Sequence, residues 1–572
     1  MDAARLLAAA EAWIAADPDP EDRRELQGLI DAEDLEALEA CMSGILAFGT
    51  AGIRGEVGAG SNRMNRAVVI RTTAGLAAYL NRVRPDAGPV ALGFDARLSS
   101  RAFADDAIGV LVAAGIPVRF FADPAPTPLV AYAARRIGAT AAVVITASHN
   151  PPQDNGYKVY DANAAQIIPP VDAEIAAEIA AAQPANQVER IRGILTAGHP
   201  AAVPFGPEMA EQYVADLAAI RPPSARGGPL TIVYTPLHGV GRDLAVRALW
   251  NAGFRTVIPV PEQAEPDGRF PTVAFPNPEE PGALDLAKAL ATAERADLIL
   301  ANDPDADRLA VCVPVPGGWR TLSGNQIGLL LADFVLGFEH SSETPIVINS
   351  LVSSPMLGLI AADYGAHWEQ TLTGFKWICN AALDLEADGS GRFSFGFEEA
   401  LGYSVGRVVR DKDGIGAAVW FADLAMACRE AGVTVLDRLA GLYRRHGLWV
   451  STQKAVVRPG ADGVAEIAGA MASLRDSSPD SLAGIAVEGT TDYRDGAEVR
   501  ARWLGAQALV VFHLEGGGRV LARPSGTEPK LKIYVDLKGS LGFGADVDAA
   551  ESALLDQATA AASDLAAFLG FD

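Results

Sequence analysis

The chain has 572 residues, of which 49% are hydrophobic and 21% are charged, so it has enough apolar material for several folded domains. Its net charge of −24 argues against nucleic acid or an anionic membrane as the main partner, and no apolar run approaches the roughly 18–20 residues of a membrane span. The amino terminus does not resemble a signal peptide, and four scattered cysteines (Cys41, Cys312, Cys379, Cys428) indicate neither a disulfide framework nor a zinc site, so we expect a cytoplasmic protein.

The first ~40 residues show helical spacing of apolar side chains, interrupted by Asp-Pro-Asp-Pro at 17–20. One pattern then occurs three times: an apolar strand, a helical stretch and a second apolar strand. The strand pairs lie at 90–95 and 114–121, at 230–235 and 252–258, and at 345–350 and 364–369. Short apolar strands that alternate with helices predict parallel sheets covered on both faces.

Each copy is followed by a third strand that ends in a polar loop, at 142–151, 298–308 and 393–402. Ligands of open α/β sheets bind beyond the carboxyl ends of the strands, so these loops are expected to line one cleft. The last ~125 residues differ, since strands at 508–514, 519–523 and 531–536 and a helix at 546–569 predict a smaller antiparallel α+β domain.

The predicted fold class is therefore α/β, with three similar mixed-sheet α/β domains and a C-terminal α+β domain around one central cleft. The expected domains are a helical extension with the first α/β domain, a second and a third α/β domain, and the α+β domain, at 1–203, 204–322, 323–440 and 441–572.

The first chemical motif is Thr146-Ala-Ser-His-Asn-Pro151, which places Ser148 in a tight turn after a buried strand. An ordinary turn with capping Ser and Asn side chains is the simplest interpretation of such a short motif. Because a serine hydroxyl is a weak nucleophile until a base or metal activates it, a catalytic Ser148 requires a partner elsewhere in the chain.

That partner is predicted at Asp303-Pro-Asp-Ala-Asp-Arg308, where Asp303, Asp305 and Asp307 alternate and can converge on one cation. Hard oxygen ligands favour Mg²⁺, and three close carboxylates need a counter-ion. An Asx-rich turn or a calcium loop is the alternative, although an EF-hand is excluded because no glutamate follows at the required offset.

Other motifs offer groups suited to a phosphosugar. Arg523-Pro-Ser-Gly-Thr-Glu-Pro-Lys530 combines a guanidinium, hydroxyls and a glycine turn that can surround a phosphate, or it is a surface hairpin. Glu398 and Glu399 follow a strand and can accept hydrogen bonds from sugar hydroxyls, or pair with a nearby base. The glycine-containing segments around Arg54 and Lys376 can contact phosphate or simply turn the chain, and His238 is interpreted as a structural turn residue.

Taken in this order, the motifs closely resemble those of the α-D-phosphohexomutase superfamily, which contains phosphoglucomutases and phosphomannomutases. The resemblance extends from about Phe48 to Val535, and the N-terminal extension and Gly-Phe-Glu-Glu-Ala-Leu-Gly-Tyr are most similar to the phosphoglucomutase-2/phosphopentomutase-like branch. It implies an intramolecular phosphotransferase that interconverts sugar 1-phosphate and sugar 6-phosphate, with α-glucose phosphates expected first and pentose or mannose phosphates as alternatives.

The resemblance also implies roles for individual residues. Ser148 carries the phosphoryl group and, with Asp303, Asp305 and Asp307, ligates Mg²⁺, while Lys158 is the general base. His149, Arg54 and Arg308 complete the catalytic set. The substrate-binding positions are Lys376, Glu398, Ala400, Arg523, Ser525, Gly526 and Thr527.

A departure from the family pattern concerns Ala400, because hexose-specific members usually have a serine at this position, two residues after the glutamate. The missing hydroxyl leaves the preferred sugar open. The expected activator is a sugar 1,6-bisphosphate and the expected partner is a small phosphosugar, with either a monomer or a dimer possible. A phosphatase that passes the phosphoryl group from serine to water, and a silent sugar-phosphate binder, are the rival interpretations.

Overall fold

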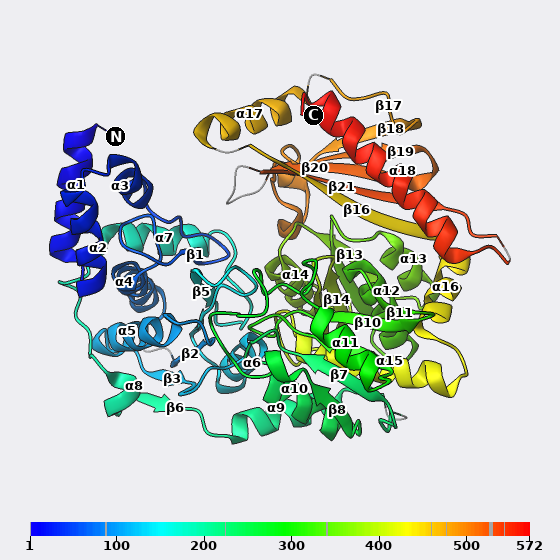
Figure 1. Ribbon diagram of the computed structural model, residues 1–572, viewed down its shortest axis with the longest axis horizontal. Helices are drawn as coiled ribbons and strands as arrows, with labels where there is room; N and C mark the ends of the chain where they lie inside the picture. Colours follow the sequence, from blue (N-terminus) through cyan, green and yellow to red (C-terminus); the bar gives the residue numbers. More distant parts are fainter. Residues whose placement is uncertain are drawn as a thin grey trace. The chain divides into compact units, whose positions relative to one another are not determined.

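The computed structural model describes residues 2–85, 88–222, 225–338, 341–458, 460–475, 477–524, 530–542 and 544–571 (Figure 1). The chain forms two compact units. The first contains Met1–Leu322 and Gly402–Asp423, and the second contains Ser323–Leu401 and Leu424–Asp572.

The N-terminal extension consists of three helices, α1 (Ala3–Ala16), α2 (Pro20–Asp31) and α3 (Leu35–Met42). Asp2, Asp19 and Asp34 cap their amino termini, and Pro20 occupies the first turn of α2, where its missing N–H costs nothing. Leu6, Leu26 and Leu38 are among the residues of a small shared core. The predicted helical segment and its break at 17–20 are confirmed.

The first sheet has the strand order β1-β5-β4-β2-β3-β6. Strand β2 pairs in parallel with β3 and β4, whereas β5 is antiparallel to both β4 and β1. The strands are β1 Ile53–Glu56, β2 Val90–Phe94, β3 Val118–Phe120, β4 Ala141–Ile145, β5 Asp154–Tyr160 and β6 Ala202–Pro204. The helices are α4 Arg66–Val83, α5 Ser100–Ala113, α6 Thr127–Ile137, α7 Val171–Ala181 and α8 Ile194–Ala197.

The second sheet, also in the first unit, has the order β11-β10-β9-β7-β8. Strand β7 pairs in parallel with β8 and β9, and β10 is antiparallel to β9. Its elements are β7 Thr231–Thr235, β8 Thr256–Pro259, β9 Leu298–Ala301, β10 Ala310–Val315, β11 Gly318–Thr321, α9 Glu208–Ala219, α10 Arg242–Asn251, α11 Asp285–Ala293 and a 3-10 turn at Pro261–Gln263.

A short later segment also belongs to the first unit. It contains β15 (Gly402–Val405), whose Gly402 forms an isolated bridge with Arg308. Tyr160 and Tyr213 donate hydrogen bonds of 2.6 Å to the carboxylates of Asp411 and Asp413. These buried contacts fix the segment in place, and α15 (Gly414–Glu430) follows it.

In the second unit, β12 (Pro345–Ser350) pairs in parallel with β13 (His367–Thr371) and β14 (Arg392–Glu398). The accompanying helices are α12 Gly324–Gly337, α13 Met356–Asp363, α14 Phe375–Ala387 and α16 Val435–His446. Helix α12 begins at a capping box formed by Ser323 and Gln326.

The last sheet is antiparallel, in the order β16-β21-β20-β19-β18-β17, and Figure 1 shows α18 running along it. Alanines on one face of α18 join its core. Its elements are β16 Leu448–Val457, β17 Ser481–Leu482, β18 Ile485–Asp492, β19 Val510–Leu514, β20 Arg519–Pro524, β21 Lys530–Gly539, α17 Gly460–Ser473, α18 Val547–Phe568 and 3-10 turns at Ala497–Val499, Arg502–Leu504 and Glu515–Gly517.

The threefold repeat is confirmed by topology. In each copy the first strand (β2, β7, β12) lies between the other two and is parallel to both. The α/β class with a C-terminal α+β domain is thus confirmed. Within the described residues, no helix is long and apolar enough to cross a membrane, and the four cysteines are buried and unbridged.

Candidate active site

Ser148 lies in the loop between β4 and β5. Its backbone adopts a left-handed conformation (φ 53°), which is uncommon for a residue other than glycine, and its N–H donates a hydrogen bond of 2.8 Å to Thr146 Oγ1. The side chain is buried, and its Oγ donates to Asp303 Oδ2 at 2.9 Å. The turn therefore aims the hydroxyl at the aspartate loop rather than at solvent.

Two buried features hold this loop. Arg97 donates hydrogen bonds of 2.6–2.8 Å to four backbone carbonyls of the loop, those of Ser148, Asn150, Pro151 and Asp154. At Gly156, an added Cβ would lie 2.6 Å from the carbonyl oxygen of Thr146 and 2.8 Å from that of Ile53, so only glycine allows this close packing. We did not predict a role for Arg97, although its place just after β2, at the sheet edge where β4 also ends, is a signal in the sequence.

The three aspartates converge in the loop after β9. Asp303, Asp305 and Asp307 are fully buried, and each offers a carboxylate oxygen within 4.8 Å of the others. The Oδ1 atoms of Asp305 and Asp307 are buried without a hydrogen-bond partner among the described residues. Burial and the neighbouring carboxylates of Asp305 and Asp307 raise the pKa of Asp303 well above its ordinary value. Unsatisfied buried oxygens of this kind fit a hard divalent cation.

Neighbouring backbone shapes the aspartate loop. Val240 N donates to Pro304 O at 2.8 Å, and a Cβ at Gly239 would lie 2.3 Å from Pro304 Cα, so the turn at 236–241 packs directly against the loop. His238, in that turn, contacts Thr272 Oγ1 at 2.9 Å through Nε2. From α6, Thr127 donates to Asp305 through both N–H and Oγ1, a support that we did not predict.

Two buried lysines face the carboxylates. Lys158 Nζ lies 2.7 Å from Asp305 Oδ2 and 3.0 Å from Asp307 Oδ2. Lys412 Nζ lies 3.0 Å from Asp307 Oδ2 and 3.3 Å from Asp411 Oδ1. Burial lowers the pKa of each lysine, but the carboxylates raise it further, and the net shift is upward. Sequence reasoning missed Lys412, although the polar run Arg410-Asp-Lys-Asp-Gly414 was a visible signal.

The other predicted catalytic side chains of the first unit lie close by. His149 Nδ1 is 3.3 Å from Ser148 Oγ, and burial together with Arg308 and Arg54 lowers the pKa of His149. Arg308 donates its backbone N–H to Asp303 Oδ1 at 3.0 Å. Arg54 is exposed, and its Nη1 donates to Asn150 Oδ1 at 2.8 Å. The structure thus brings Ser148, the three aspartates and all four predicted catalytic partners together.

The predicted sugar-binding residues belong to the second unit. Glu398 Oε1 accepts a 2.7 Å hydrogen bond from Gly374 N, which joins the glutamate to the turn that carries Lys376. Glu399 Oε2 accepts from Ser353 Oγ at 3.0 Å, and Ser353 Oγ accepts from Glu399 N. Ala400 follows, half-buried. Both glutamates are therefore held by hydrogen bonds within this unit.

The predicted phosphate loop is described only at its first residues. Arg523 lies in β20, and its buried Nε has no hydrogen-bond partner among the residues that the structure describes. Ser525, Gly526 and Thr527 lie outside the described residues.

Comparison with known proteins identifies the family. Models described as Phosphoglucomutase/phosphomannomutase, alpha/beta/alpha domains I, II and III, match residues 46–186, 211–317 and 323–446, and the model of the C-terminal domain matches 461–541.

Individual relatives agree. A probable phosphomannomutase of Haemophilus influenzae is 40% identical over 83% of this chain and 93% of its own length. A phosphopentomutase of Mus musculus is 35% identical to this chain, and the match covers 92% of this chain and 89% of the relative's own length. The crystal structure of a putative phosphomannomutase from Thermus thermophilus, 23% identical, covers 90% of this chain and 98% of its own with a TM-score of 0.68, and so shares the fold. The chain therefore belongs to the α-D-phosphohexomutase superfamily, in its phosphoglucomutase-2/phosphopentomutase-like branch, and is an isomerase of the metal-dependent phosphosugar mutase type.

Proposed function

We propose that the chain interconverts sugar 1-phosphate and sugar 6-phosphate, with α-glucose phosphates as the first expected pair, through phosphorylated Ser148 and a sugar bisphosphate. The observation that carries the proposal is the contact of 2.9 Å between Ser148 Oγ and Asp303, beside carboxylate oxygens that have no hydrogen-bond partner among the described residues. A hydroxyl placed against such a cluster is in position to exchange a phosphoryl group.

In each half-reaction one P–O bond breaks and one forms. The bond between phosphorus and Ser148 Oγ breaks, the attacking sugar hydroxyl bonds to phosphorus, and its proton passes to a base. In the second half, the other phosphate of the bisphosphate returns to Ser148, and the isomeric monophosphate leaves. A sugar 1,6-bisphosphate supplied from solution would phosphorylate Ser148 by the same step, which accounts for its proposed role as activator.

Ser148, Asp303, Asp305 and Asp307 would hold Mg²⁺, which supplies charge neutralisation for the phosphoryl and serine oxygens. Lys158 is the proposed base, supported by its burial beside the aspartates. Because those carboxylates raise the pKa of Lys158, it can accept a proton only when they are neutralised by another charge. Arg54, His149 and Arg308 are proposed to stabilise charge on the transferred group.

We assign substrate recognition to the second unit. Glu398 is proposed to accept hydrogen bonds from sugar hydroxyls, and Lys376 to orient the sugar. Arg523, with Ser525, Gly526 and Thr527, is proposed to bind the phosphate that does not react, and the buried Arg523 Nε without a hydrogen-bond partner supports this assignment.

Proposed domain boundaries follow residues 203 and 322, with a third near 440. The family matches support the first two. The third match ends at 446 and α16 runs unbroken from Val435 to His446, so a boundary after His446 instead of residue 440 would keep this helix within one domain.

The alternative substrate is a pentose or mannose phosphate. Ala400 offers no hydroxyl to the sugar, and the relatives include a phosphopentomutase and a probable phosphomannomutase. A coupled assay with Mg²⁺ and catalytic glucose 1,6-bisphosphate should compare kcat/KM for glucose, mannose and ribose 1-phosphates. The highest value for glucose 1-phosphate supports the first proposal, and a lead for another sugar replaces it. Release of inorganic phosphate without an isomer would instead indicate a phosphatase.

The nucleophile is tested by Ser148→Ala, for which we expect turnover to fall at least about 10⁴-fold while the sugar phosphate still binds. Ser473→Ala, at an exposed serine ending α17, is the matched control and should remain active. Substantial residual turnover in Ser148→Ala would contradict the assignment, and ³²P transfer from labelled bisphosphate to the native chain alone would support it.

A further inference from the structure

A cavity of about 440 Å³ lies in the first unit, where the N-terminal extension meets the first α/β domain. Figure 1 shows the blue helices α1, α2 and α3 at one end of the first unit, with α1 and α2 next to α4. On one side Trp13 packs against a small core that includes Ala67 and Ala185. The cavity remains because α1 presents alanines rather than larger side chains, among them Ala9, Ala12 and Ala16.

The walls are mainly apolar. Trp13, Met42, Ile45 and alanines of α1 and of the 182–185 segment form most of the lining. Ile45 is 66% exposed, which is unusual for a large aliphatic side chain and leaves an open apolar rim. A volume of this size, with predominantly apolar walls and few polar groups, is typical of small-molecule sites.

Arg71 supplies a cation to this cavity. Its Nε is buried without a hydrogen-bond partner, and no hydrogen bond or ion pair joins its side chain to any residue that the structure describes. Other arginines of α4 are paired: Arg66 with Asp106 at 2.6 Å, and Arg82 with Glu178 at 2.9 Å. A buried N–H group without a partner is costly, and an anion is the group that would satisfy it.

The acidic residue in the lining, Asp17, forms no ion pair or hydrogen bond with Arg71 among the described residues. Its carboxylate instead accepts a hydrogen bond of 3.0 Å from Trp13 Nε1 and one of 2.8 Å from Asp19 N. These contacts stabilise the end of α1. The cationic charge of Arg71 therefore remains available to a ligand.

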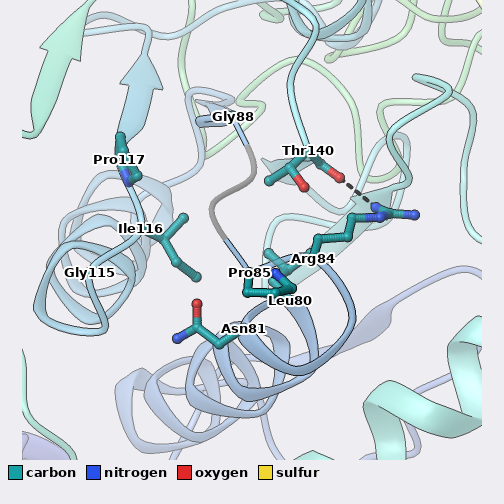
Figure 2. A pocket seen from close by; sticks show the side chains of 9 residues that line it. All are labelled: Leu80, Asn81, Arg84, Pro85, Gly88, Gly115, Ile116, Pro117 and Thr140. Atoms are coloured by element: carbon teal, nitrogen blue, oxygen red, sulfur yellow. Dashed lines mark hydrogen bonds between the residues drawn. The ribbon is translucent and has the colours of Figure 1, made fainter.

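A second cavity, of about 350 Å³, is lined by Arg84, an arginine whose side chain already has hydrogen-bond partners (Figure 2). There Arg84 Nη1 donates to Thr140 O at 2.7 Å, and Arg84 Nη2 lies 2.6 Å from Asp161. Its guanidinium is already paired with a carboxylate and a carbonyl, so this cavity offers no comparable anion site.

We infer that the cavity at Arg71 binds a small organic anion, with an apolar body against Trp13, Met42 and the alanines and a carboxylate at the guanidinium. Residues of α1 and α3 lie before residue 46, where the match to the family's first domain begins. The site is thus built jointly by the extension and the first domain, apart from the proposed catalytic residues and independent of the proposed reaction.

Octanoate is the probe, because it combines a carboxylate with an apolar chain of suitable size. Titration of the full-length chain by calorimetry should show saturable one-site binding with Kd on the order of 1 mM or tighter. Octylamine and 1-octanol should bind at least about tenfold more weakly, since they lack the anion, and acetate should not bind, since it lacks the apolar body.

Two variants, with Arg82→Gln as the control, test the charge and the shape of the cavity separately. Arg71→Gln should abolish the preference for octanoate over octanol, whereas Arg82→Gln, on the same helix, should retain it. Ala12→Phe should weaken binding of both ligands by filling the cavity. Unchanged melting temperature and mutase turnover would show that the variants are folded. Equal binding of octanoate and octanol by the native chain, or undiminished octanoate binding by Arg71→Gln, would overturn the inference.

Discussion

The buried aspartates of the first unit and Asp333 of the second unit differ in whether all their carboxylate oxygens have hydrogen-bond partners. In the first unit, one oxygen each of Asp305 and Asp307 has no hydrogen-bond partner in the part of the chain that the structure describes, although Lys158 contacts both residues. In the second unit, Asp333 is fully engaged: Oδ1 accepts from Tyr364 and Arg445 at 3.0 Å, and Oδ2 accepts from Arg438 at 2.6 Å. A complete shell indicates a structural role, whereas open oxygens in a buried cluster indicate a ligand.

The two clusters also differ in how deeply their charged groups are buried. The Asp333 cluster ties α12 to α13 and α16, and its arginines are partly exposed. The aspartate loop is fully buried and holds three carboxylates in one turn, which burial and mutual repulsion disfavour. Such an arrangement is expected where function, rather than stability, determines the sequence.

Of the changes that test this comparison, Asp305→Asn should have the largest effect, because it removes one proposed ligand charge with little change in shape. We expect turnover to fall by roughly 10³-fold or more, because a metal site of this kind supplies several kcal/mol of transition-state stabilisation. Circular dichroism should remain close to that of the native protein, because Lys158 keeps Asp307 as a partner at 3.0 Å. Near-native turnover at saturating Mg²⁺ would show that the open oxygens are not ligands.

Asp333→Asn should produce the opposite pattern. Arg438 and Arg445 would lose their carboxylate partner, and we expect the melting temperature to fall by several degrees while kcat is unchanged. The loss is moderated because both arginines are partly exposed. Calorimetric scans beside the mutase assay provide the measurement, and a loss of kcat without loss of stability would reverse the distinction.

A smaller effect is expected from Mg²⁺ itself. A cation that binds only the folded chain stabilises it by about 2.7 kcal/mol at 100 times its Kd, so Mg²⁺ should raise the melting temperature by a few degrees and chelation should reverse this. The shift should disappear in Asp305→Asn and persist in Asp333→Asn. Equal shifts in both variants would place the metal elsewhere.

The smallest effect concerns a third cluster, at Asp22 in α2. Burial, then Asp17 and Asp19, raise the pKa of Asp22 to about 7. The folded chain therefore retains a proton that the unfolded chain releases near pH 4, and stability from this group is lost as pH rises from about 4 through 7.

Asp22 is only half-buried, so the change in melting temperature between pH 5 and pH 8 should be a few degrees at most. Asp22→Asn should reduce this pH dependence, while Glu21→Gln, an exposed neighbour, should not. An identical pH profile for the native chain and Asp22→Asn would refute the assignment.

Much of the fold follows from the sequence because short apolar strands and intervening helices carry a strong pattern. The three copies of the repeat and the antiparallel strands of the last sheet lie where that pattern predicts. The cluster of Ser148 and the aspartates was also predictable, since both motifs follow strands at the carboxyl edge of a sheet.

Sequence reasoning missed two partners of the site, although the sequence marked the segments that carry them. Arg97 lies just after β2, but its acceptors are backbone carbonyl oxygens, which every residue has. Lys412 reaches Asp307 from a segment about a hundred residues later. The cation at Arg71 is conspicuous only because its neighbours in space are apolar, which depends on how the extension packs.

Gly156 limits which substitutions the site can accept. It takes no part in the chemistry, yet any larger residue there would collide with Thr146, in the chain that leads to Ser148, and with Ile53 of the neighbouring strand β1. Substitutions in the substrate loops leave this packing untouched, whereas any side chain at position 156 would disturb it. The loop that carries the nucleophile therefore depends on a position where there is no room for a Cβ atom.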